Sequence, residues 1–116
     1  MIVKKDHDIE TLTFYVQLLM EMKELEKYPF IKMLIAKGVT EKEYQELIML
    51  LSNISEEFEA QKEAGMLDFT GLLIHYAGKL NPKLHPDELM DALIAENRFL
   101  EVMIQLKKIR QREDYF

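Results

Sequence analysis

Residues 40–65 of this 116-residue chain read TEKEYQELIMLLSNISEEFEAQKEAG, and this stretch decides the fold. Thr40 and Glu43 have the spacing of a helix capping box, in which a threonine hydroxyl and a glutamate side chain each bond to an exposed backbone N–H. Gly65 is the residue type that most often follows the end of a helix. Between these signals the apolar residues recur at intervals of three and four, the period of an α-helix. They are Tyr44, Leu47, Ile48, Leu50, Leu51, Ile54 and Phe58. We therefore expect a helix from Thr40 to about Ala64, roughly 36 Å long at 1.5 Å per residue.

Glycine and proline divide the rest of the chain into further helix-sized segments. A strand is not predicted, because the sequence has no sustained alternation of polar and apolar residues and no Asn-Gly or Asp-Gly turn. Asp6 or Asp8 is available as the first N-cap, and Asn97 suits a left-handed break before the last helix. The expected helices cover about 8–27, 29–38, 40–64, 69–78, 86–96 and 98–113. The sequence thus predicts an all-α, multi-helical bundle of five to six helices, with a long central third helix, in one domain spanning residues 1–116.

Composition excludes several classes of function. Hydrophobic residues make up 48% and charged residues 31%, as in an ordinary folded protein. The chain has no cysteine, which agrees with a reducing compartment. A formal charge of −6 opposes the neutralisation of phosphates that drives binding to nucleic acids. The first ten residues lack the features of a signal peptide, and no apolar run approaches the length of a membrane span. We expect a cytoplasmic protein that binds neither nucleic acid nor membrane.

The first predicted helix carries more apolar surface than one core requires. Its apolar residues cover an arc of roughly 200°, whereas a helix packed on a single core needs only about 100°. This helix is therefore predicted to be either central to the bundle or shared with another chain. Leu100 and Ile104 similarly fall on the far side of the last helix. We predict self-association, with a dimer favoured, through Ile9, Leu12, Val16, Leu19, Leu100 and Ile104.

Catalytic and cofactor motifs are absent from the sequence. No histidine has a glutamate three residues before it, no HExxH motif occurs, and neither a nucleophile elbow nor a glycine-rich phosphate loop is present. We predict no enzyme activity, no cofactor and no metal. Two alternatives stay open: a metal site at His7 and Glu10, and a tuned histidine at His75 beside Tyr76.

The distribution of charge and the number of methionines indicate candidate contact surfaces. Residues 41–64 contain seven acids and two bases, whereas Lys107, Lys108, Arg110 and Arg112 form a basic run. These two regions can attract each other, although cations at a helix C-terminus also offset the helix dipole. The chain contains eight methionines, a residue that fills irregular cores and adaptable binding surfaces. Met49 is predicted to project away from the apolar arc of its helix.

A family resemblance extends over nearly the whole chain. It rests on Ile9-Glu10, the run from Tyr15 to Leu19, Tyr28-Pro29-Phe30, Lys37-Gly38, Ala60-Gln61-Lys62 with Gly65, and the run from Ala77 to Asn81. In this order the residues resemble the YhaI-like proteins of Bacillus and its relatives. The resemblance implies a compact multi-helical fold and a cytoplasmic bacterial protein that associates with itself. It implies no activity for any residue.

Two functional hypotheses remain. The first is a non-enzymatic, self-associating protein-interaction or regulatory module that presents a helical groove or an acidic face to a protein partner. The second is a small-ligand-binding bundle or an unusual enzyme with a pocket near His75 and Tyr76.

Overall fold

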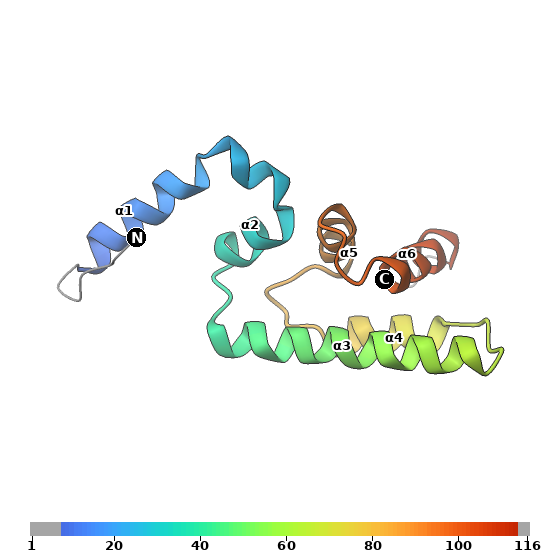
Figure 1. Ribbon diagram of the computed structural model, residues 1–116. Coiled ribbons are helices and arrows are strands. Elements are labelled where there is room, and N and C mark those ends of the chain that lie inside the picture. The colour runs from blue at the N-terminus through green and yellow to red at the C-terminus, as the bar shows by residue number, and fades with distance from the viewer. Residues whose placement is uncertain (1–7, 114–116) are drawn as a thin grey trace.

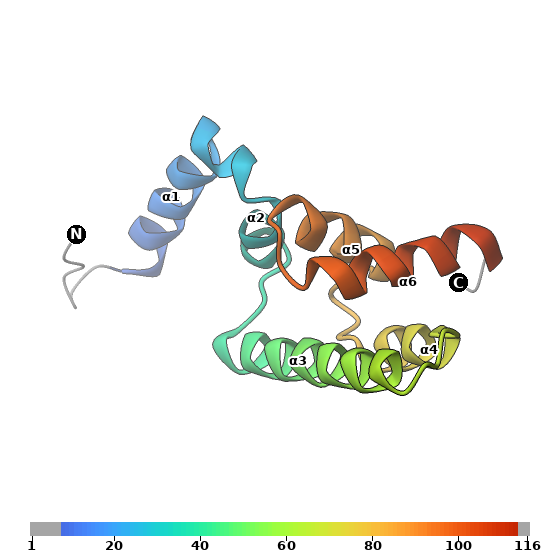
Figure 2. The same cartoon turned by 45° about the vertical axis from the view of Figure 1, so that its right-hand side comes forward.

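The computed structural model describes residues 8–113, in which every regular element is helical. α3 (Glu41–Glu63) and α4 (Thr70–Lys79) lie side by side in one layer, and α5 (Pro86–Ala95) and α6 (Leu100–Glu113) form a second layer above them (Figure 1, Figure 2). α2 (Pro29–Ala36) packs against α5. It is preceded by α1 (Ile9–Met20) and a short 3-10 helix, η1 (Lys23–Lys27). The predicted all-α, multi-helical fold of five to six helices is confirmed.

The capping box predicted for the third helix is present. The Glu43 N–H donates to the Thr40 hydroxyl at 3.2 Å, and the Thr40 N–H donates to the Glu43 carboxylate at 2.9 Å. These bonds satisfy donors that the first helical turn leaves without partners. The helix runs for 23 residues, or about 35 Å at 1.5 Å per residue, and it spans the length of the two-layer body.

Three helices end in the same left-handed geometry. Gly38, Gly65 and Asn97 have φ values of 65°, 79° and 58°. After each of them, the next backbone N–H bonds back to the carbonyl five residues before it, as in a Schellman motif. The break predicted at Asn97 is therefore confirmed. The last helix nevertheless begins at Leu100 rather than Arg98, because Phe99 is also left-handed, with φ 49°.

The core lies between the two layers and extends to α2. Each large apolar side chain of this core contributes about 1.5–3 kcal/mol to the stability of the fold when it is removed fully from water. Phe58 and Phe69 meet across the α3–α4 connection with ring centroids 4.7 Å apart. The buried apolar residues are Phe30, Leu34, Leu47, Leu51, Ile54, Phe58, Phe69, Leu72, Leu73, Tyr76, Leu80, Leu84, Leu89, Met90, Ala92, Leu93, Val102, Met103, Leu106 and Ile109. This pattern follows the apolar face predicted for the third helix, and Met49 projects outward as predicted, 67% exposed.

The first predicted helix is wrong in its extent. It does not continue to Lys27: Met22 adopts an extended conformation (ψ 131°), and η1 follows after this break. Pro29 disfavours helical geometry only in the residue before it, Tyr28, so it ends η1 and does not cause this break. Of the two alternatives predicted for this helix, a central position in the bundle is contradicted, since none of the side chains of α1 is buried. A surface shared with another chain stays a prediction.

Instead, α1 and η1 project from the body as an arm (Figure 1, Figure 2). The molecule measures 55 × 25 × 24 Å, with a radius of gyration of 16.8 Å. A compact chain of this length has a radius of gyration of about 13 Å. Within residues 8–113, no helix combines the length and apolarity needed to cross a bilayer.

Candidate functional site

The arm, residues 8–27, is the most unusual surface of the described chain. Asp8 caps α1 by accepting the Thr11 N–H at 2.7 Å, and this bond lowers the pKa of the Asp8 carboxyl. Along α1 the large apolar side chains face outward: Ile9 is 83% exposed and Leu19 is 52% exposed. Phe14, Val16, Leu18 and Met22 are also exposed. A folded chain leaves this much contiguous apolar surface uncovered mainly at sites of interaction.

One side of the arm is hollowed. Tyr15, Leu18, Leu19 and Met22 line an apolar hollow of about 290 Å³. The Tyr15 ring also lies 6.1 Å from the Phe14 ring, centroid to centroid. Such a notch can receive an apolar side chain from a partner, in the manner of helix recognition by anchor residues.

The six residues predicted for self-association do not form one surface. Ile9, Leu12, Val16 and Leu19 all lie on the arm, where Leu12 is half-buried and the other three are exposed. Leu100 and Ile104 lie on α6, which packs against α3, α4 and α5. Leu100 is 37% exposed, and Ile104 is half-buried. The use of these residues in an oligomer stays a prediction.

The two residues of the predicted pocket have separate environments. The Tyr76 ring is fully buried, and its hydroxyl donates to the Pro86 carbonyl at 2.7 Å. Burial, followed by the charges of Asp87 and Asp91, raises the pKa of Tyr76 well above its usual range. The His75 side chain is 39% exposed, with its Nδ1 3.7 Å from a Glu57 carboxylate oxygen. Neither residue lines the hollows described in this section.

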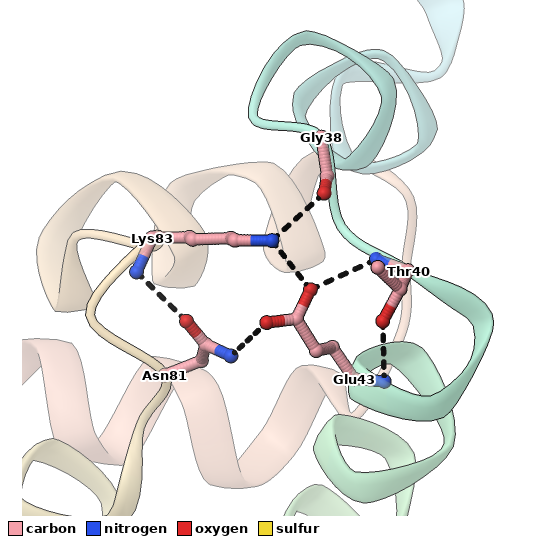
Figure 3. Close-up of polar contacts among 5 residues, drawn as sticks. All are labelled: Gly38, Thr40, Glu43, Asn81 and Lys83. Carbon is pink, nitrogen blue, oxygen red and sulfur yellow. Dashed lines mark hydrogen bonds and ion pairs between the residues drawn. The ribbon is translucent and has the colours of Figure 1, made fainter.

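A polar cluster joins the α2–α3 and α4–α5 connections (Figure 3). Glu43 accepts hydrogen bonds from the Lys83 ammonium at 2.6 Å and the Asn81 amide at 3.0 Å, besides the Thr40 N–H. Lys83 also donates to the Gly38 carbonyl at 2.9 Å. The Lys83 contact, followed by the bonds from Thr40 and Asn81, lowers the pKa of Glu43 to about 2. A carboxylate with these partners stays ionised near neutral pH, so its contacts fix two loops rather than exchange a proton.

A second carboxylate, that of Glu96, fixes the start of α2, the helix that follows the arm. The Glu96 side chain is 4% exposed and accepts the N–H groups of Phe30 at 2.6 Å and Ile31 at 3.1 Å. It thus serves as an acceptor for the first turn of α2, where the N-cap residue Tyr28 makes no side-chain cap. Arg98 donates to Glu96 at 3.1 Å and lies 5.2 Å from the centre of the Phe30 ring. Through these contacts the body fixes the point from which the arm departs.

The end of the body away from the arm carries a groove, here called the distal groove. It comprises two adjoining hollows of about 560 and 310 Å³, which share Leu67, Phe69 and Gln105. Leu67 is 82% exposed at the edge, whereas Phe69 is buried beneath it. The remaining lining residues are Phe58, Lys62, Asp68, Thr70, Glu101, Lys108, Ile109 and Arg112.

The acids that line this groove are already engaged. Glu101 pairs with Lys62, and this contact raises the pKa of Lys62. Asp68 accepts from both the hydroxyl and the N–H of Thr70, which lowers the pKa of Asp68. Lys108 is exposed at the rim.

The basic run of α6 is divided between two neighbours. Lys107 pairs with Asp91 at 2.5 Å and Arg110 pairs with Asp87 at 3.3 Å, so these two cations fasten α6 to α5 rather than to the acidic α3. A hollow of about 320 Å³ lies beside them. Lys108 and Arg112 line the distal groove instead.

No group of three or more potential metal ligands occurs among residues 8–113. The alternative left open at His7 and Glu10 falls partly outside this range, because His7 lies beyond the described residues.

The model of a family described as "Protein of unknown function (DUF1878)" matches residues 3–111. The chain belongs to the DUF1878 family. Because the match includes α1, the arm is part of the DUF1878 domain rather than an addition to it. The match also takes in the distal groove up to Gln111. The family brings no activity to any residue.

The sequence indicated the apolar surface of the arm in this DUF1878 protein but not the groove. The wide apolar arc of the first helix predicted that this helix is either central to the bundle or shared with another chain. The apolar pair Met66-Leu67 directly after Gly65 is the comparable signal for the groove, because an exposed connection between helices is usually polar. Glu96 offered no such signal, since its N–H partners lie 66 and 65 residues away.

Proposed function

We propose that this DUF1878 protein is a non-enzymatic interaction module that self-associates through its arm, with a dimer as the favoured state. The observation that carries the proposal is that α1 has an apolar arc of roughly 200° and no buried side chain. We further propose a regulatory role in which the assembled protein offers its acidic α3 face to a protein partner.

The size of the uncovered surface is consistent with association. Six arm side chains are each about half exposed or more, and burying the exposed part is worth roughly 1 kcal/mol per side chain. Two arms together therefore provide about 12 kcal/mol, against an association cost of about 4–15 kcal/mol. This balance favours a reversible oligomer over a permanent one.

The resemblance to the YhaI-like proteins supports the same proposal, since it implies a bacterial, cytoplasmic protein that associates with itself. We favour the module over a ligand-binding bundle or enzyme with a pocket near His75 and Tyr76. The Tyr76 hydroxyl is already bonded to the Pro86 carbonyl, and its ring is part of the core.

Sedimentation velocity over a range of protein concentrations tests the proposal. The wild type is expected to form a dimer, and the double variant Leu12→Glu/Val16→Glu is expected to sediment as a folded monomer, because neither side chain is buried in the body. Met49→Glu is the control: it places a glutamate on an exposed apolar residue of α3, away from the arm, and should leave the dimer intact. A monomeric wild type at all concentrations, or a double variant that still dimerises, would refute the assignment of the arm.

A further inference from the structure

An uncovered apolar arm and a groove with polar edges lie at opposite ends of the molecule. The arm extends at one end, and the α3–α4 connection with the C-terminal half of α6 forms the other (Figure 1, Figure 2). The distal groove at that second end has a floor of buried Phe58, Phe69 and Ile109, with exposed Leu67 at its edge. Each end therefore presents the kind of surface that the other could cover.

The groove matches the arm in length and in shape. From Glu101 to Arg112 it follows α6 for about 17 Å, and the 12 residues of α1 are about 18 Å long. A single flat surface covers an apolar stripe of about 100°, half of the arc on α1. A groove with a floor and two edges contacts a wider arc, so it covers the arm better than a second arm laid alongside would.

The charges of the two surfaces are opposite. From Asp8 to Met22 the chain contains three acids and no lysine or arginine, whereas the groove is lined by three cations (Lys62, Lys108 and Arg112) and two acids (Asp68 and Glu101), a net formal charge of +1. Lys108 and Arg112 bring this positive charge to the groove. A helix seated there would place its acids within about 8–10 Å of these cations, the distance over which charges act at moderate salt.

The arm of a chain cannot reach the groove of the same chain. The molecule is 55 Å long, and α2, at the root of the arm, is fastened to α5 and Glu96. We propose that the arm of one copy docks in the distal groove of a second copy. When two copies lie side by side in opposite directions, each arm occupies the groove of the other copy, and the result is a closed dimer. This inference rests on the proposed function and names the surface that receives the arm.

Site-specific cross-linking tests this placement, because the chain contains no cysteine and each introduced thiol is unique. The variants are Leu19→Cys on the arm, Leu67→Cys at the groove and Met49→Cys as a control on α3, all at exposed residues. Pairs of single variants are mixed, left to exchange subunits, treated with a short bismaleimide and separated on a denaturing gel. Thermal unfolding verifies that each variant is folded.

We expect Leu19→Cys mixed with Leu67→Cys to give roughly tenfold more cross-linked dimer than Leu19→Cys alone or mixed with Met49→Cys, since docking raises the effective concentration of the two thiols. A dominant product from Leu19→Cys alone would show that arms pair with arms. That result would overturn the groove as the receptor and leave the proposed function standing. A dominant product with Met49→Cys would overturn it in the same way. A wild type that stays monomeric and gives no product in any mixture would overturn both.

A charge exchange gives an independent readout. Lys108→Glu is expected to raise the dissociation constant roughly fivefold, the combined effect of two exposed ion pairs, one at each groove of the dimer, and Glu21→Lys in the same chain should recover part of that loss. Assembly that does not respond to Lys108→Glu would contradict the docking of the acidic arm beside this residue.

Discussion

Replacing Glu96 by alanine removes one buried acceptor from three donors at once. The carboxylate accepts the N–H groups of Phe30 and Ile31 and the guanidinium of Arg98. A hydrogen bond to a charged group contributes about 1.5–3 kcal/mol, and the lower figure applied to the two N–H groups gives a loss of about 3 kcal/mol. For a chain of this length, that loss lowers the melting temperature by about 12 °C.

The conservative variant separates charge from shape. Glu96→Gln keeps an oxygen for the two N–H groups but loses the charge, so we expect about half of the loss, near 1.5 kcal/mol. Glu56→Ala, at an exposed position of α3, is the control and should change stability by no more than about 0.5 kcal/mol. Urea unfolding followed by circular dichroism measures all three variants. A loss below about 1 kcal/mol for Glu96→Ala would show that water replaces the carboxylate and would refute the reasoning.

Two further predictions concern the polar contacts of the body. Because the pKa of Glu43 is lowered from 4.5 to about 2, the stability contributed by its ionised form is complete above about pH 4.5 and is lost as the pH falls towards 2. Glu43→Gln should therefore lose less stability than the wild type between pH 5 and pH 2 in denaturant titrations, and parallel pH curves would contradict this. Tyr76→Phe should cost about 1 kcal/mol, since it removes the part-buried hydrogen bond to the Pro86 carbonyl while keeping the ring, and a change below about 0.5 kcal/mol would argue that this bond contributes little.

Local signals predicted the helices well because the responsible groups are close in sequence. Thr40 and Glu43 are three residues apart, and Gly65 and Asn97 change the backbone direction at their own positions. The break after Met20 was not predicted, because neither glycine nor proline occurs there. The next residues are Glu21 and Met22, and neither is a residue type that signals the end of a helix.

Long-range features could not be predicted from local patterns. The apolar arc of α1 shows that a partner surface is needed, but periodicity does not identify which surface that is. The arm could equally have been the centre of the bundle. The distal groove combines the end of α3, the residues around Leu67 and one side of α6, and only the folded topology brings these segments together.

The exposure of α1 has a consequence for its own stability. A free helix of 12 residues is marginal in water, because the cost of nucleating it is repaid only by a longer helix or by tertiary contacts. None of its side chains is buried in the body, so we expect an unoccupied arm to unwind without disturbing the core. Assembly would then supply part of the folding energy of the first fifth of the chain. The helix content of the arm and its resistance to proteases would rise with protein concentration, so that a dilute chain would differ in structure from a concentrated one.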